Sequence, residues 1–155
     1  VKTHFEKTEY SPATTAAPSN PGLKATWYDF KGKTCAEIAA APVKKTYRVE
    51  DVTIPKGVKS FIIGLTYKGY INIPEDGIYS FYLSSDDGSM LYIDGKQVID
   101  NDGLHAPGEV TGQAALKQGY HPIEVQYFDH GGGSINLKVC DNNGKEMPFT
   151  YLYAH

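Results

Sequence analysis

The sequence has little cysteine, methionine or tryptophan, no long apolar run and no cluster of basic residues. Its apolar stretches fall well short of the roughly 20 residues that a helix needs to cross a bilayer. The formal net charge is -3, and a basic surface of the kind that binds nucleic acid is missing. We therefore expect no membrane span and no nucleic-acid partner.

The two cysteines, Cys35 and Cys140, are far apart in the chain. They lack the paired spacing of a zinc site. Their number and separation fit either one long-range disulfide, formed in an oxidising compartment, or two buried thiols. The sequence leaves both alternatives open.

Catalytic motifs are also missing. There is no Gly-x-Ser-x-Gly elbow and no phosphate-binding loop. Adjacent carboxylates such as Asp86 and Asp87 cannot cleave a glycoside as a pair, because that reaction needs two carboxyl groups facing each other across about 5 to 9.5 Å. Because catalytic motifs are missing, we expect this chain to be non-enzymatic. It begins with neither a Met nor a signal-peptide pattern, so we also expect it to be a piece of a larger protein.

Tyrosine is abundant, with 12 residues, and its ring suits pleated sheets with wet faces. Apolar and polar residues alternate with a period of two in several short segments, as half-buried strands require. The expected strands are Lys24–Phe30, one from Tyr47 onward, Ser60–Ile73, Gly77–Leu83, Leu91–Ile93, Gln97–Ile99, Glu109–Lys117, His121–Phe128, Ser134–Cys140 and Phe149–Tyr153. This pattern predicts an all-β fold, an antiparallel β-barrel or sandwich.

Local signals add detail to this fold. Asp94-Gly95 favours a tight hairpin turn, and we expect the strands on either side of Ser84–Gly88 to form a central hairpin. Thr34–Glu37 has the spacing of a capping box and predicts one short helix, which Pro42 must end.

The N-terminal part has a different composition. Residues Val1–Tyr10 alternate weakly and are interpreted as the end strand of a preceding domain. Residues Ser11–Pro21 are rich in Pro, Ser, Thr and Ala and are interpreted as a linker. The domain proper is expected to span residues 22–155.

The loop Ser84–Gly88 is a cluster of oxygen-bearing side chains. Asp86-Asp87-Gly88 has two interpretations, a simple turn or a site for a hard cation such as Ca²⁺, because carboxylates on a turn can converge on one ion. Other loops could contribute to the same site. Asn101 and Asp102 offer oxygens to a shared site, and His105 is either structural or in contact with a ligand.

The segment Asp129–Gly133 contains Asp129, His130 and three glycines. It has two interpretations, a hairpin turn or a backbone-exposed recognition loop on a rigid sheet. The sequence does not choose between them.

Several motifs, in order along the chain, resemble the family named after the anthrax-toxin protective antigen, the PA-fourteen domain. They are Ile73-Pro74-Glu75-Asp76-Gly77-x-Tyr79-x-Phe81, Ser85-Asp86-Asp87-Gly88-Ser89-x-Leu91-x-Ile93-Asp94-Gly95, and Gly119-x-His121-x-Ile123-x-Val125-x-Tyr127 with the run Gly131–Gly133. The resemblance covers Gly22 to Tyr153. It implies a β-barrel or sandwich that serves as an accessory module in glycosidases, adhesins, proteases and toxins.

The resemblance also implies a site. In the flocculin and adhesin branch of this family, two adjacent aspartates joined by a cis peptide bind Ca²⁺, which in turn grips sugar hydroxyls. By motif position these are Asp86 and Asp87. The segments Ile73–Gly77 and Asp100–His105 look most like modules appended to bacterial glycoside hydrolases such as β-hexosaminidases, in which catalysis belongs to another domain.

The function implied is that of a non-catalytic carbohydrate-binding or substrate-positioning module of a larger secreted glycoside hydrolase. Its expected location is periplasmic, cell-surface or extracellular, and its expected partners are a glycan and the catalytic domain of the same polypeptide. The alternatives are a structural domain that packs on its parent enzyme without binding sugar and an adhesin-like protein-binding module. The residues expected to contact ligand are Asp86, Asp87, Asn101, Asp102, His105, Asp129 and His130, of which Asp86 and Asp87 are also the expected metal ligands.

Overall fold

The computed structural model describes residues 9–15, 19–58, 62–148 and 150–153, and nearly all of its regular structure is β. The interpretation of Val1–Tyr10 as a strand therefore falls mostly outside the described residues. The strands are β1 (Asn20–Pro21), β2 (Leu23–Tyr28), β3 (Val43–Val49), β4 (Ile63–Ile73), β5 (Gly77–Ser85), β6 (Ser89–Ile93), β7 (Lys96–Asn101), β8 (Gly108–Leu116), β9 (Gly119–Asp129), β10 (Ile135–Cys140) and β11 (Tyr151–Tyr153). No helix in this part of the chain is long and apolar enough to cross a membrane.

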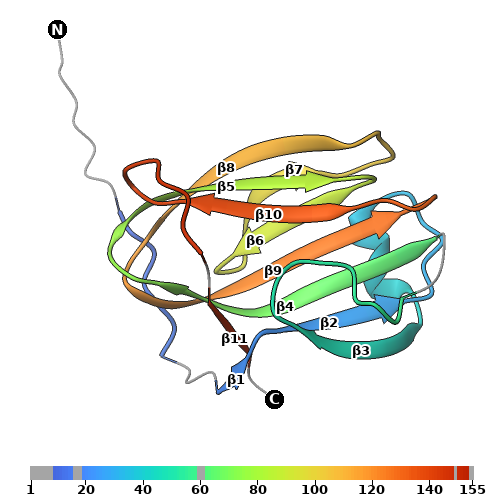
Figure 1. Cartoon of the computed structure of the whole chain (residues 1–155), viewed down its shortest axis with the longest axis horizontal. Coiled ribbons are helices and arrows are strands. Elements are labelled where there is room, and N and C mark those ends of the chain that lie inside the picture. Colours follow the sequence, from blue (N-terminus) through green and yellow to red (C-terminus); the bar gives the residue numbers. More distant parts are fainter. Residues whose placement is uncertain (1–8, 16–18, 59–61, 149, 154–155) are drawn as a thin grey trace, which may run out of the picture.

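The strands form two antiparallel sheets that face each other (Figure 1). The large sheet has the order β1-β11-β4-β9-β6-β7, with β2 pairing with the first half of β4 and β3 pairing with β2. The small sheet has the order β10-β5-β8. The predicted all-β fold is confirmed, in the form of a sandwich of two sheets rather than a closed barrel.

The core lies between the two sheets and follows from the alternation in the sequence. In β9, Ile123, Val125 and Tyr127 are buried, while Glu124 and Gln126 between them lie on the outer face and are only partly buried. Burying each such apolar side chain contributes about 1.5–3 kcal/mol. The strands are therefore held together by the face that the period of two predicted.

Three fully buried tyrosines keep their hydroxyl groups paired with backbone carbonyls. Tyr67 donates to Thr53 O at 2.8 Å and Tyr127 to Asp86 O at 2.8 Å, and the third, Tyr79, behaves in the same way. A buried hydroxyl without a partner would be costly. These bonds attach the loops to the sandwich.

Two connections differ from the sequence prediction. The strands β5 and β6 do not pair, because β5 belongs to the small sheet and β6 to the large one. The predicted central hairpin is therefore wrong, and the loop between these strands crosses from sheet to sheet. The same holds between β9 and β10, so the hairpin interpretation of Asp129–Gly133 is also wrong. The hairpin of β6 and β7 is confirmed, with φ of 55° at Asp94 and 76° at Gly95.

The short helix is present as a 3-10 helix, η1 (Cys35–Ala40), which covers part of the outer face of the large sheet. The Thr34 side chain makes no cap bond to the helix backbone. Its hydroxyl donates instead to Glu37 Oε1 at 3.0 Å, which also accepts the amide of Lys33. Beneath the helix lies a second apolar cluster made of Phe30, Cys35, Ile38, Met90 and Phe128.

The described part of the segment interpreted as a linker is attached to the domain. The Ser11 amide donates to Ala115 O at 2.8 Å, and the Lys117 amide donates to Ser11 O at 2.9 Å. At the other end of the segment, β1 pairs with β11. Over these residues the chain is part of the fold rather than a free tether.

Cys35 and Cys140 are both free and buried, one in the second cluster and one at the end of β10. The disulfide alternative is therefore wrong, and the alternative of two buried thiols is confirmed. Burial raises the pKa of the Cys35 thiol, and the negative charge of nearby Asp102 raises it further. The reactive thiolate of Cys35 is therefore scarce at neutral pH.

We expect thiol reagents to react slowly with the native chain and to titrate both cysteines after denaturation, whether or not a reductant was added first. The measurement is a colorimetric thiol assay in native buffer and in guanidinium chloride. Fast reaction of Cys35 in the native protein would contradict its burial. A thiol count that rises only after reduction would contradict the free state of the pair.

Candidate functional site

Three connections between the two sheets meet at one end of the sandwich, the right-hand end in Figure 1. Residues 86–88 join β5 to β6, residues 102–107 join β7 to β8, and residues 130–134 join β9 to β10. We call this region the loop end. It contains or borders every residue that the sequence predicted as a ligand contact.

The Asp87 side chain ties the three connections together. Its Oδ1 accepts the amide hydrogen of His105 at 3.1 Å, and its Oδ2 accepts that of His130 at 2.9 Å. The peptide bond between Asp86 and Asp87 is cis. A carboxylate has about four lone-pair sites, so each oxygen of Asp87 can accept a further ligand.

Three carboxylates gather at this point. One oxygen from each of Asp86, Asp87 and Asp129 can be chosen so that all lie within 4.8 Å of one another. Burial raises the pKa of Asp129, the amides of Gly131–Gly133 lower it, and the charge of Asp87 raises it, with a net rise. Among the described residues, no Lys or Arg forms an ion pair with this acidic cluster. Sequence reasoning expected Asp129 as a ligand contact but missed it as a third metal-ligand candidate, because the fold alone brings it beside Asp86.

A layer of polar groups supports the acidic cluster from the interior. Ser85 Oγ lies 2.5 Å from Ser89 Oγ and donates to the carbonyl of Asp87 at 2.8 Å. The Asn101 amide donates to Gly108 O at 3.1 Å and to Ser85 Oγ at 3.3 Å. Asn101 is 9% exposed, and its side-chain nitrogen braces the loops from the interior. Its contact with a ligand stays a prediction.

His105 closes the connection between β7 and β8. Its Nδ1 lies 2.7 Å from Ala106 O, and its Nε2 lies 2.8 Å from Asn101 O. Both neighbours are acceptors, so both ring nitrogens donate when the ring is protonated. Burial lowers the pKa of His105, but these two bonds and the charges of Asp87 and Asp86 outweigh it and raise the pKa overall. The His105 ring therefore holds the connection between β7 and β8 in place through both of its nitrogens.

His130 anchors the connection between β9 and β10. Its Nε2 lies 2.5 Å from Gly32 O. Its ring stands edge-on to Phe128, with centroids 5.7 Å apart, and to Phe30 at 6.5 Å. The His130 ring is thus directed to the second apolar cluster, while its amide reaches Asp87.

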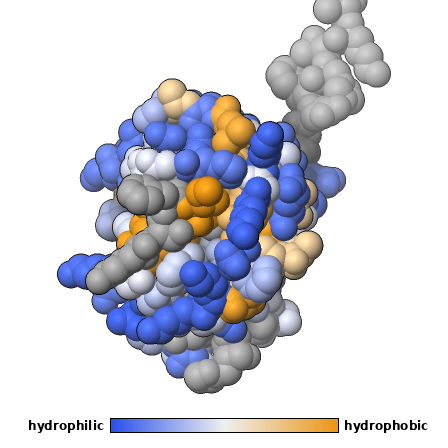
Figure 2. Space-filling model, turned by 90° about the vertical axis from the view of Figure 1, so that its right-hand side faces the viewer, coloured by the Kyte–Doolittle hydropathy of each residue, from blue (hydrophilic) through white to orange (hydrophobic). Residues whose placement is uncertain are grey.

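Asp102, the first residue of the connection between β7 and β8, links the loop end to η1. Its Oδ1 accepts the amides of Cys35 at 2.8 Å and of Gly103 at 2.9 Å. The next residue but one, Leu104, is 50% exposed. Figure 2 looks onto this end and shows a mainly hydrophilic surface with a few exposed hydrophobic side chains. The loop end therefore presents both polar and apolar groups to solvent.

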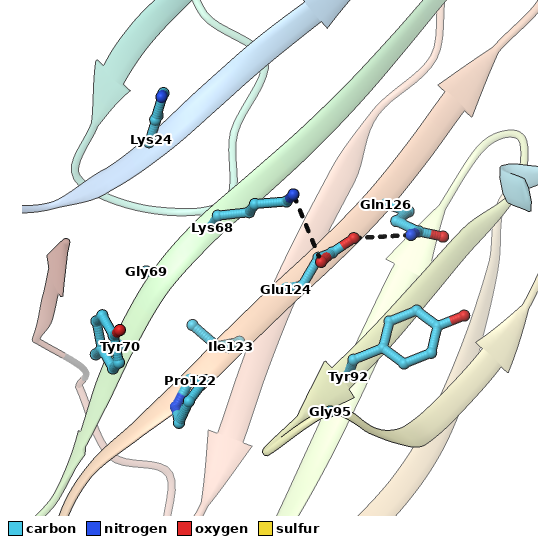
Figure 3. Close-up of a pocket in the computed structure, with 10 residues that line it drawn as sticks. All are labelled: Lys24, Lys68, Gly69, Tyr70, Tyr92, Gly95, Pro122, Ile123, Glu124 and Gln126. Carbon is cyan, nitrogen blue, oxygen red and sulfur yellow. Dashed lines mark hydrogen bonds and ion pairs between the residues drawn. The ribbon is translucent and has the colours of Figure 1, made fainter. Parts of the chain in front are cut away.

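A second feature lies on the outer face of the large sheet and was not predicted. It is a cavity of about 610 Å³, which we call the outer-face cavity (Figure 3). Its lining includes the side chains of Lys24, Lys68, Tyr70, Tyr92, Glu124 and Gln126. Their outward positions in the alternating strands were the available signal, but such positions look alike on any solvated sheet face.

A family model described as the PA14 domain matches residues 19–151. Among curated proteins, a β-hexosaminidase of Porphyromonas gingivalis is 36% identical over 77 residues, which cover 49% of this chain and 9% of that protein. An α-agarase of Thalassotalea agarivorans is 41% identical over 68 residues, covering 44% of this chain and 4% of that protein. The matches thus span less than a tenth of each of these relatives.

Among solved structures, the PA14 sugar-binding domain from an RTX adhesin superposes with a TM-score of 0.74 at 18% identity. The alignment covers 88% of this chain and 100% of that one. At this level of identity the likeness concerns the fold.

Gly88 lies at a closely packed point of the loop end. A Cβ at this position would lie 2.5 Å from Phe128 Cε1 and 2.7 Å from Gly103 N. We expect Gly88→Ala to lower the free energy of unfolding by about 1–3 kcal/mol, as overpacking does. The measurement is urea denaturation followed by circular dichroism.

The matched control is Gly131→Ala in the connection between β9 and β10, where a Cβ would meet nothing within 4 Å. This variant should keep the stability of the parent. Equal stability of the two variants would show that Gly88 is not confined as described.

Proposed function

The chain belongs to the PA14 domain family, and we propose that it is a non-catalytic carbohydrate-binding module of a larger, exported glycan-degrading enzyme. Two relatives, named as a β-hexosaminidase and an α-agarase, support the association with glycan-cleaving enzymes. The adhesin domain described as sugar-binding supports the ligand class. In this proposal the chain acts at the cell surface, in the periplasm or outside the cell, beside the catalytic domain of its own polypeptide.

The observation that carries the proposal is the acidic cluster of Asp86, Asp87 and Asp129 at the loop end. Three carboxylates close together repel one another unless a cation or a proton compensates them. Ca²⁺ takes six to eight oxygen ligands in flexible geometry, so the donor set fits this ion. Held by these three carboxylates, Ca²⁺ would supply coordination sites for sugar hydroxyls.

The surrounding residues would prepare the site. Asp87 holds two connections in place through the amides of His105 and His130. The carboxylate of Asp86 accepts no hydrogen bond from the described residues, so it is available to an ion. Because this framework is formed in advance, little conformational entropy is lost when a ligand binds.

Tethering makes a weak site useful. A module joined to a catalytic domain meets the same polysaccharide at a raised effective concentration, which increases the overall avidity without new contacts. The mechanism we propose is therefore substrate positioning, with bond cleavage left to the rest of the enzyme.

One observation favours a second candidate function. Asp87 accepts two main-chain amides, which by itself explains an Asp-Asp loop as a structural feature. In this alternative the domain packs on its parent enzyme without binding sugar. An adhesin-like module that binds protein through the exposed Leu104 region is a further alternative.

We expect Ca²⁺ to raise the melting temperature of the chain. At 100 times the dissociation constant, a ligand of the folded state adds about 2.7 kcal/mol of stability, or about 5–10 °C for a chain of this size. Asp86→Asn should remove the rise while leaving the Asp87 contacts in place. The measurement is differential scanning fluorimetry with and without EDTA.

The matched control is Asp51→Asn, which removes a carboxylate charge in the exposed turn after β3 and keeps an oxygen for the amide of Val52. It should retain the full response to Ca²⁺. If the unsubstituted chain shows no rise in melting temperature with Ca²⁺, the metal site is discarded.

Carbohydrate binding is tested separately on a glycan array that includes N-acetylhexosamine oligosaccharides and agar fragments. We expect the parent to bind at least one glycan in Ca²⁺ and Asp86→Asn to bind it much more weakly. If the unsubstituted chain binds no glycan on the array, the structural alternative is favoured.

A further inference from the structure

One row of outward side chains crosses four strands of the large sheet at the outer-face cavity. Lys24 in β2 pairs with Lys68 in β4, Lys68 with Glu124 in β9, and Glu124 with Tyr92 in β6. Side chains that point outward at paired positions are neighbours on the same face of a sheet. The cavity is therefore a trough that runs across the strands, and Figure 3 shows the row from one side to the other.

Two tyrosine rings stand on opposite sides of β9. Tyr92 is opposite Glu124, and Tyr70 of β4 is opposite Pro122. The two tyrosines are thus two strands and two residues apart, or about 12 Å between their backbone positions at normal sheet spacings. Both side chains are partly exposed. A single sugar ring is too small to contact both, whereas a chain of several rings can.

The hydrogen-bonding groups beside the rings are already positioned. Gln126 Nε2 donates to Glu124 Oε2 at 2.8 Å, and Lys68 Nζ lies 4.0 Å from Glu124 Oε1. Each of these three groups keeps free donors or acceptors beyond these contacts. Because they stand on paired strands, their positions depend on the sheet rather than on a loop, which favours binding at low entropic cost.

The mixture of charges limits the class of ligand. An anion would meet Glu124 at the centre of the row, and a cation would meet Lys24 and Lys68. Sugar hydroxyls both donate and accept hydrogen bonds, and the C–H faces of sugars can lie on tyrosine rings. A neutral, hydroxylated chain is therefore the ligand that satisfies all parts of the trough.

The rest of this sheet face supports the assignment. The helix η1 and the second apolar cluster cover the neighbouring part of the face, and Tyr92 packs partly against that cluster. They border the trough on the side toward the loop end, because Met90 and Phe128 lie nearer to that end of β6 and β9 than Tyr92 and Gln126 do. On the part of the trough away from β6, Lys24 and Lys68 are exposed. An open trough admits the middle of a polysaccharide as well as its end.

We propose that the outer-face cavity is a second carbohydrate-binding surface, which takes a linear, neutral oligosaccharide and needs no metal ion. It is separate from the loop end, and it goes beyond the function proposed above because it rests on different residues. Only the choice of probe sugars rests on that proposed function.

The experiment is a titration of the ¹⁵N-labelled chain with chitohexaose, cellohexaose and neoagarohexaose in EDTA, followed by two-dimensional NMR. We expect amide shifts around Lys68, Tyr92 and Gln126 with at least one of these sugars, and none at residues 86–88 or 130–134. Tyr70→Ala and Glu124→Gln should each weaken binding about tenfold. Absence of binding by all three sugars in EDTA would overturn the proposal.

One variant controls for effects on folding. Tyr82→Ala removes a comparable ring from the outer face of the small sheet, where Lys138 lies over it at 4.7 Å, and should leave the affinity unchanged. Equal weakening by Tyr82→Ala and Tyr70→Ala would overturn the assignment to this cavity.

The two proposals fail in different ways. Binding that requires Ca²⁺, is lost in Asp86→Asn and is unaffected by Tyr70→Ala and Glu124→Gln would support the loop end and overturn the outer-face cavity. Binding that persists in EDTA and in Asp86→Asn but is weakened by Tyr70→Ala and Glu124→Gln would support the cavity, whatever the loop end does.

Discussion

The carboxylate of Asp87 determines the geometry of the loop end, because its two oxygens accept amides from two different connections between the sheets. Hydrogen bonds to a charged group contribute about 1.5–3 kcal/mol each. The buried amide of Asn101 and hydroxyl of Ser85 support the same region from the interior. The positions of Asp86 and Asp129 therefore depend on the protein framework, and the acidic cluster exists before any ligand arrives.

The strand β9 connects the two surfaces. Its outward residues Glu124 and Gln126 line the outer-face cavity, and its last residue, Asp129, belongs to the acidic cluster. The two surfaces use different physics, since one concentrates negative charge and the other combines rigid rings with mixed hydrogen-bonding groups. A polysaccharide that contacted both would gain avidity from their fixed separation. In the function that we propose, the two surfaces together would hold substrate near a catalytic domain.

Much of the fold could be predicted from the sequence, but the partners of the strands could not. The inward faces of β9 and β10 followed from alternation, and the turn at Asp94-Gly95 followed from its need for positive φ. The loop Ser84–Gly88 was interpreted as a turn within one sheet, and a hairpin turn was one of the two interpretations of Asp129–Gly133, yet both segments cross between sheets. Turn-forming residues serve either purpose, and the choice depends on which sheet buries the following strand.

By itself, the sequence determined the strands, the faces they bury and the presence of adjacent carboxylates in one loop. These properties depend on local backbone preferences and on the period of two. Only the tertiary structure decided that Asp129 joins Asp86 and Asp87, that Asn101 faces the interior, and that Tyr70 and Tyr92 border one cavity. The reason is physical, because each of these arrangements depends on the pairing of strands that are distant in the chain, which no local pattern encodes.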